Sequence, residues 1–353
     1  MRPEKQCVAR LIIAPILILL LLPLCAVAGE QQYFSLGEFP LEKGGAIEDC
    51  TLGYRTYGTL NSARSNAVLF PTWYAGTSSE LEAFIGPGKM LDTSRYFIVA
   101  VDSFGNGVSS SPSNSMRQKA RSFPEFTIGD MVKAELRLIT EHFNITRLRA
   151  VIGISMGGVQ AFYFAAAYPD RAEKIIPITA SPRPTSYDIL FFSTQLAALE
   201  GVRTTPAWDG RSLQIVAGLN AMASSTAARF IALNSRTDLA SRMEKERSNI
   251  REKNPLDLAW QIKAVLAHDI YAVPSAPVNL SRLDRSSILT ILSKQDLMLN
   301  PAPAREFAEA TGTGLAMFDS DCGHYIFQCE YAAIAALVSR FLENWLRIVS
   351  RRV

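Results

Sequence analysis

The sequence predicts an α/β fold in which a mainly parallel sheet has helices on both faces and an inserted helical lid. Short apolar runs alternate with segments of helical periodicity along most of the chain. That alternation stops between residues 183 and 285, where the pattern is helical, and then resumes. Because strands of a parallel sheet are buried on both faces, continuous apolar strands that alternate with helices indicate a covered parallel sheet.

Six short segments rich in valine, isoleucine and phenylalanine are the predicted strands of this sheet. They are residues 66–72, 96–103, 149–154, 174–180, 287–293 and 314–319. Helices are expected between them at 127–143, directly after residue 155 and at 303–311, and an amphipathic helix at 331–351 closes the chain.

The helical interruption is interpreted as a lid over the carboxyl edge of the sheet. Its predicted helices include residues 187–199, 213–233 and 255–272. The alternative is a set of ordinary surface helices, but so long a break between two core strands favours a lid. The predicted domains are therefore a core in two parts, 29–182 and 286–353, with a lid at 183–285.

The first 28 residues predict a secretory signal peptide rather than part of the fold. A basic start precedes an apolar run at 11–24, and the small residues Ala-Val-Ala at 26–28 follow it. An uncleaved anchor and a lipoprotein signal ending at Cys25 are the alternatives, yet the run is shorter than the ~20 apolar residues of a membrane span. We expect cleavage after Ala28, a periplasmic or secreted protein, and no stable membrane anchor afterwards.

The composition of the mature chain excludes several classes of function. Without the signal, the chain has 33 lysines and arginines and 32 acidic residues, so its net charge is close to zero. It has no long basic run and no interleaving of basic and aromatic residues. Nucleic acid is therefore not an expected partner. The whole chain has three histidines, which excludes a histidine-rich metal centre, and we expect no metal or other cofactor.

Three cysteines, Cys50, Cys322 and Cys329, remain after the signal. An odd number in an exported protein means at least one unpaired or intermolecular thiol. Cys322 and Cys329 either form a bridge around the segment that carries His324 or remain buried free thiols.

Ser155 is the candidate nucleophile. Gly153, Ser155 and Gly157 form G-x-S-x-G between an apolar strand and a helix, the pattern in which a serine occupies a sharp strand-to-helix turn. Glycines suit that turn because a β-carbon would crowd its strained backbone. The hydroxyl would then lie at the carboxyl edge of the sheet, beside amides of the helix N-terminus. The alternative is an ordinary glycine-flanked serine that starts a helix.

A serine hydroxyl needs a base, and the base needs a carboxylate to orient it. Asp296 follows one predicted strand and His324 follows the next, so the order Ser, Asp, His is that of α/β-hydrolases. A hydrogen-bonded structural histidine is the alternative for His324. Other aspartates are rivals for the acid, namely Asp284, Asp319 and Asp321.

The negative charge of a tetrahedral intermediate needs two backbone donors. One is expected to be the N–H of Met156, directly after the nucleophile, and the other should come from the loop after the first predicted strand. Among Trp73, Tyr74 and Ala75 in that loop we favour Tyr74. An aromatic turn that packs under the lid is the alternative.

Several long motifs resemble homoserine O-acetyltransferases and their relatives. They are "YRTYGTLN" at 54–61, the stretch 85–114, "FTIGDMVKAE" at 126–135 and "GISMGGVQAFYFAAAYPD" at 153–170. The resemblance implies an α/β-hydrolase core with a helical lid, a ping-pong mechanism through an acyl-serine, and a homodimer formed through the lid. It places Ser155, Asp296 and His324 on the family's triad.

Two positions depart from that family. Thr194 stands where the family has a lid arginine that holds the homoserine carboxylate, and Tyr325 replaces the aspartate after the catalytic histidine. A charge-assisted hydrogen bond contributes ~1.5–3 kcal/mol to binding. The loss of both charged side chains therefore argues against a zwitterionic amino acid as acceptor. Trp73, Tyr187, Phe191 and Tyr325 are expected to line an apolar substrate pocket, although core packing explains them equally well.

The predicted function is an exported serine hydrolase of the acetyltransferase-like group that acts on a small-molecule acyl ester. The first alternative is an O-acyltransferase that passes the acyl group to an alcohol or amine. The second is a non-catalytic binding protein on a hydrolase scaffold, which has no need of all three triad residues.

Overall fold

The computed structural model describes residues 29–201 and 210–343. The predicted signal peptide at 1–28 lies outside the described residues, as does the end of the helix predicted at 331–351. Cleavage of the signal therefore stays a prediction.

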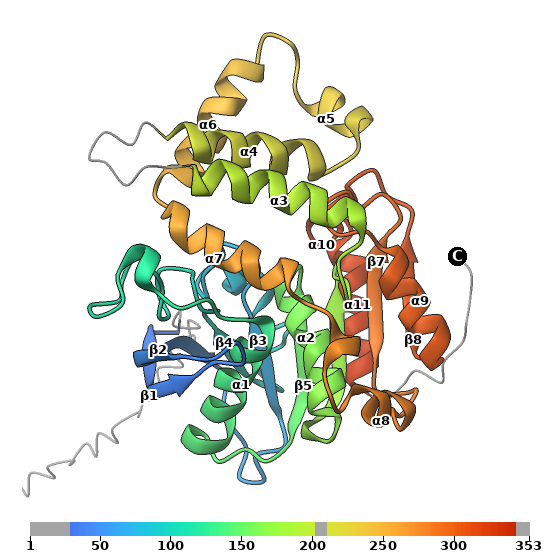
Figure 1. The fold of residues 1–353 in the computed structure, drawn as a ribbon. Helices are drawn as coiled ribbons and strands as arrows, with labels where there is room; N and C mark the ends of the chain where they lie inside the picture. Colours follow the sequence, from blue (N-terminus) through green and yellow to red (C-terminus); the bar gives the residue numbers. More distant parts are fainter. Residues whose placement is uncertain (1–28, 202–209, 344–353) are drawn as a thin grey trace, which may run out of the picture.

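One eight-stranded sheet forms the centre of the molecule, in the order β1-β2-β4-β3-β5-β6-β7-β8 (Figure 1). The pairs from β4 to β8 are parallel, and β1 and β2 join them as antiparallel strands at one edge. The strands are β1 Gln32–Pro40, β2 Ala46–Tyr57, β3 Ala67–Pro71, β4 Phe97–Val101, β5 Leu148–Ile154, β6 Ala172–Ile178, β7 Leu289–Ser293 and β8 Gly314–Phe318. All six predicted strands are confirmed, and β1 and β2 were not predicted.

Helices cover both faces of the sheet. They are α1 Ile128–Arg137, α2 Met156–Ala167, α3 Ser186–Glu200, α4 Arg211–Ala223, α5 Ala227–Leu233, α6 Leu239–Arg251, α7 Pro255–Leu266, α8 Ala276–Ser281, α9 Ala302–Thr311, α10 Ile326–Cys329 and α11 Tyr331–Leu342. Leu69 packs in the cluster that holds α1, α2 and α9, whereas Val68 and Phe70 pack in the cluster that holds α11. This alternation is what a strand buried on both faces requires, and the predicted fold class is confirmed.

The inserted helices lie between β6 and β7. Figure 1 shows α3 to α6 as a layer above the carboxyl edge of the sheet, with α7 between that layer and the core. The helix predicted at 213–233 is instead two helices, α4 and α5, bent by 107°. The break follows from the sequence Ser-Ser-Thr at 224–226, because Thr226 leaves the helical conformation and caps α5 by accepting from the Arg229 amide. The boundaries predicted for the core and the lid stay predictions.

Across 29–201 and 210–343, no single helix is long and apolar enough to cross a membrane. The bent pair Arg211–Ala223 and Ala227–Leu233 reaches the required length and apolar composition only when its two helices are taken together.

His268, just after α7, should make the fold sensitive to acid. Its side chain is buried, and neither ring nitrogen has a hydrogen-bond partner in the described part of the chain. Burial lowers the pKa of His268 to about 3. The unfolded chain takes up this proton near pH 6.5 and the native protein does not, so stability should fall as the pH drops from about 6.5 towards 3, by up to ~1.4 kcal/mol per pH unit.

We therefore expect His268→Leu to flatten the pH dependence of the free energy of unfolding between pH 6.5 and 4. Urea denaturation of both proteins across that range measures it, and His142→Leu, at an exposed histidine, is the matched control. Equal slopes for the wild type and His268→Leu would contradict the prediction.

Candidate active site

Ser155 occupies a strained turn between β5 and α2. Its φ of 56° and ψ of −123° lie in a region that residues with a side chain rarely adopt. The Ser155 amide donates to Ile178 O at 2.9 Å, which fixes the turn to the neighbouring strand β6. A β-carbon at Gly153 would lie 1.9 Å from Gly157 O, and one at Gly157 would lie 2.4 Å from Pro71 O. The turn therefore requires glycine at both positions.

The structure brings the three predicted triad residues together. His324 Nε2 lies 2.9 Å from Ser155 Oγ, and His324 Nδ1 lies 2.8 Å from Asp296 Oδ2. The Asp296 carboxylate accepts from Nδ1–H, which leaves Nε2 to accept the proton of the Ser155 hydroxyl. His324 and Asp296 are both buried. Their hydrogen bond is therefore shielded from competing water.

Asp296 is held by its own turn. Its Oδ1 accepts from the amides of Met298 at 2.9 Å and Leu299 at 3.0 Å. The same turn is fixed from the lid, since Asp188 of α3 accepts from the Asn300 amide at 2.8 Å. The rival carboxylates have other partners: Asp284 binds Ser286, Asp319 binds Lys294, and Asp321 binds Arg229.

The loop after β3 carries the candidate oxyanion donors. Ala75 is already engaged, because its amide donates to Gln261 Oε1 at 2.8 Å. The amides of Trp73 and Tyr74 have no acceptor among the described residues. On the other side of the site, Met156 is the first residue of α2, a position whose amide has no acceptor within its own helix. Met156 with Trp73 or Tyr74 therefore remains the candidate pair.

An aromatic cluster lies on one side of the histidine. The Phe327 ring lies 6.2 Å from that of Trp73, 5.4 Å from that of Tyr325 and 6.5 Å from that of His324. Phe327 was not predicted, and its position three residues after His324 is the one signal for it in the sequence. Tyr187 is exposed and Phe191 packs against Phe192, so a role for either in a pocket stays a prediction.

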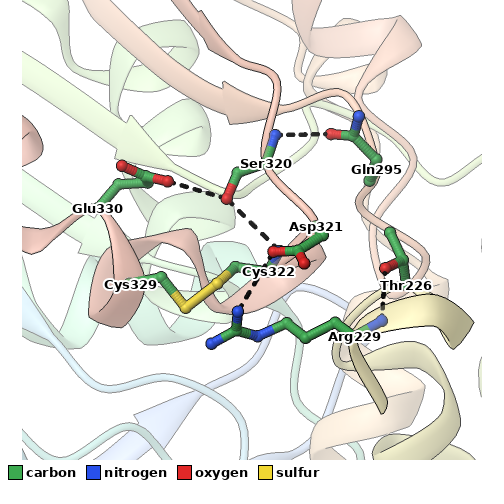
Figure 2. The surroundings of a disulfide bond; sticks show 8 residues. All are labelled: Thr226, Arg229, Gln295, Ser320, Asp321, Cys322, Cys329 and Glu330. Atoms are coloured by element: carbon green, nitrogen blue, oxygen red, sulfur yellow. Dashed lines mark hydrogen bonds and ion pairs between the residues drawn. A yellow bond between two sulfur atoms is a disulfide. The ribbon is translucent and has the colours of Figure 1, made fainter. Parts of the chain in front are cut away.

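A disulfide joins Cys322 to Cys329, with His324 inside the loop it closes (Figure 2). The sequence alone is compatible with this bridge or with two buried free thiols, and the structure shows the bridge. Beside it, Ser320 donates to Glu330 and receives a hydrogen bond from the Cys322 amide. The bridge thus fixes both ends of the histidine segment. Cys50 is a buried free thiol, and its burial raises its pKa to about 12.

The lid also contacts the histidine loop. The Thr226 amide donates to Asp321 O at 2.9 Å, and Arg229 Nη1 lies 3.3 Å from Asp321 Oδ1; Figure 2 shows the ion pair next to the disulfide. Helix α5 is therefore anchored three residues before His324.

Removing the disulfide should destabilise the protein. Closing so short a loop restricts the unfolded chain, which contributes roughly 2–3 kcal/mol in the chain-entropy model. We expect the double variant Cys322→Ser, Cys329→Ser to lose about that much free energy of unfolding, measured by urea denaturation. Cys50→Ser is the matched control, and only the wild type and this control should respond to added reductant. A double variant as stable as the wild type would contradict the prediction.

Comparison with known proteins places the chain in a family. Residues 68–328 match the model of the alpha/beta hydrolase fold. A homoserine O-acetyltransferase of Geotalea uraniireducens is 30% identical over an alignment that covers 87% of this chain and 94% of that protein. The chain therefore belongs to the alpha/beta hydrolase family, in the group that includes the homoserine O-acetyltransferases.

Two further relatives are hydrolases by name. An ethyl acetate hydrolase of Pseudomonas veronii is 39% identical over 197 residues, which cover 54% of this chain and 56% of that protein. The match thus spans about half the length of that relative. The crystal structure of an acetylester hydrolase from Corynebacterium glutamicum superposes with a TM-score of 0.80 at 27% identity, over 89% of this chain and 96% of that one.

Proposed function

We propose that the protein is a serine esterase that hydrolyses small acyl esters through an acyl-enzyme. The observation that carries the proposal is the continuous chain of hydrogen bonds from Ser155 Oγ through His324 to Asp296 on a strained turn. Such a chain makes an otherwise weak hydroxyl nucleophilic at neutral pH.

In the first half of the reaction, Ser155 Oγ attacks the carbonyl carbon while His324 Nε2 takes the hydroxyl proton. The carbonyl electron pair moves to oxygen, where the amides of Met156 and of Trp73 or Tyr74 stabilise the charge. When the tetrahedral intermediate collapses, the bond to the alcohol oxygen breaks and His324 returns the proton to that oxygen. Asp296 holds the imidazole and stabilises its protonated form throughout.

Water completes the cycle. It gives a proton to His324 Nε2 and attacks the acyl carbon, and the collapse of the second intermediate releases the carboxylic acid and returns the proton to Ser155 Oγ. Every proton lost by the nucleophile is therefore recovered, and no external cofactor enters the proposed mechanism.

Short, uncharged acyl esters are the substrate class that the surroundings favour. The rings of Tyr325 and Phe327 lie beside His324, and Trp73 stacks on Phe327. Aromatic surroundings of this kind suit an apolar substrate better than a zwitterion. Acetyl ester hydrolysis in the names of two relatives supports the same class.

Transfer to an alcohol acceptor is the second candidate. The match to a homoserine O-acetyltransferase, which extends over 87% of this chain, favours it. Transfer requires an acceptor to reach the acyl-enzyme before water does. The missing charged contacts at Thr194 and Tyr325 leave homoserine itself without its expected partners.

The test measures both outcomes in one experiment. The purified protein is given p-nitrophenyl acetate or ethyl acetate, with and without homoserine and simple alcohols, and free acetate and acetylated acceptor are quantified by mass spectrometry. Ser155→Ala is the blank. We expect acetate to account for the donor consumed under every condition. Acetylated acceptor in excess of acetate would establish the transferase instead.

Export is also proposed. It is supported by the predicted signal at 1–28 and by the Cys322–Cys329 disulfide, since such bonds persist mainly in oxidising compartments. We expect a periplasmic or secreted enzyme whose N-terminus is Gly29. N-terminal sequencing of protein recovered from the periplasm and medium tests it, and an intact Met1 terminus would contradict it. The homodimer implied by the family resemblance stays a prediction.

A further inference from the structure

Gln261 of the lid helix α7 connects the lid to the loop that carries the candidate oxyanion donors. Its side chain is completely buried. Gln261 Oε1 accepts from the Ala75 amide at 2.8 Å, and its Nε2 donates to Phe104 O at 2.9 Å. Ala75 follows β3 and Phe104 follows β4. One amide group therefore bridges two loops at the carboxyl edge of adjacent parallel strands.

The loop that Gln261 holds is strained. Ala75 has a φ of 60° although it is not glycine, and such a conformation persists only where the surroundings enforce it. The Gly76 amide donates to Trp73 O at 3.0 Å, and Gly76 O accepts from Asn106 at 3.0 Å. The turn is thus closed by its own backbone and tied from outside at Ala75 and Gly76. Without Gln261, the Ala75 amide loses its acceptor.

The engaged amide lies next to the two free ones. Trp73 and Tyr74 directly precede Ala75, so the direction of their N–H groups depends on the conformation that the Ala75 hydrogen bond fixes. Both ends of the Gln261 amide have partners of their own, which argues against direct contact between Gln261 and the reacting atoms. Its role is to position a donor rather than to donate.

We propose that Gln261 is a positioning residue for the oxyanion hole, so that the inserted helix α7 forms part of the catalytic apparatus. This inference rests on the proposed esterase function. Stabilisation of the oxyanion depends steeply on geometry: loss of one donor costs about 10²–10³ in kcat, and a displacement of ~1 Å costs about 10². The substrate's ground state depends less on this donor, so the loss should fall on kcat rather than on KM.

The test compares Gln261→Met with a matched variant, Gln195→Met. Gln195 of α3 is also a completely buried lid glutamine, but its Nε2 donates to Asn220 within the lid. We expect Gln261→Met to lower kcat about 30- to 100-fold with KM changed less than threefold, and Gln195→Met to leave kcat within threefold of the wild type. Gln261→Glu keeps an acceptor for the Ala75 amide and should recover at least tenfold of the lost kcat.

A second measurement separates positioning from general loosening of the lid. A trifluoromethyl ketone forms a tetrahedral adduct whose oxyanion occupies the hole. Its inhibition constant should rise for Gln261→Met in proportion to the fall in kcat/KM, while the pH dependence of kcat/KM keeps its midpoint. If Gln261→Met does not fold, Gln261→Asn, which withdraws the amide by one methylene, should still show about a tenfold fall in kcat.

Three outcomes would overturn the inference: unchanged kcat in folded Gln261→Met or Gln261→Asn, an equal loss of kcat in Gln195→Met, or an unchanged inhibition constant. Failure of the proposed function looks different. The wild type would then yield acetylated acceptor in excess of acetate, or Ser155→Ala would remain as active as the wild type. Failure of the inference alone leaves the wild type an esterase, Ser155→Ala inactive and the Gln261 variants active.

Discussion

Ser155→Ala should lower kcat on a short acetyl ester at least about a thousandfold, the loss expected when a member of a catalytic triad is removed. The reason is geometric: Oγ is the atom that lies 2.9 Å from His324 Nε2, and alanine places no nucleophile there. Initial rates with the purified variant measure the effect, and a fluorophosphonate probe should label the wild type but not the variant.

Two controls make this result specific. His324→Ala should cause a loss of similar size, and the double variant should be no slower than either single variant, because the residues act as one unit. Ser155→Ala should unfold within a few degrees of the wild type, since only one half-buried hydroxyl is lost. A folded Ser155→Ala with unchanged turnover would remove the proposed mechanism.

Gly153→Ala should prevent folding or destabilise the protein by more than ~4 kcal/mol, a size reserved for severe steric and strain effects. The added methyl would lie 1.9 Å from Gly157 O and 2.1 Å from Gly157 C, both backbone atoms that cannot rotate away. Either β5 or the first turn of α2 must shift, and Ser155 lies between them. Soluble yield, urea denaturation and esterase activity together measure the effect.

Gly218→Ala is the matched control for this substitution. Gly218 lies within α4, and apart from its chain neighbours and the backbone of its own helix, a β-carbon there would have no atom within 4 Å. The same chemical change should therefore stabilise the protein by ~0.5–1 kcal/mol, because alanine loses less conformational freedom in a helix. Similar free energies of unfolding for the two variants would show that the strand-to-helix turn tolerates a side chain.

The central strands and the triad order were predictable because each rests on strong local physics. Strands such as 67–71 are apolar at every position, and Ser155 is flanked by glycines that its turn requires. The antiparallel strand β1 was missed because only Leu36 and Phe39 of it are buried, which leaves no continuous apolar run. Edge strands with one exposed face produce this weak pattern.

Other parts of the site lacked any local signal. A single glutamine in a helix does not reveal that both ends of its amide bind loops more than 150 residues earlier in the chain. A spacing of seven between Cys322 and Cys329 is compatible with a bridge or with two thiols, and only the backbone between them decides. The bend between α4 and α5 depends on the cap at Thr226, which a hydrophobic pattern does not record.

Three lid helices each hold a different loop of the site by hydrogen bonds. Helix α3 does so through Asp188 to the Asn300 amide, and α5 through Thr226 and Arg229 to Asp321. Helix α7 does so through Gln261 to the Ala75 amide. Exchange of this insertion for that of a relative would remove all these attachments at once, without changing any residue of the triad. Chimaeras designed to change the acyl preference would then lose activity because the catalytic loops are misplaced, not because the substrate binds poorly. The loop residues that these helices contact must therefore be exchanged together with the insertion.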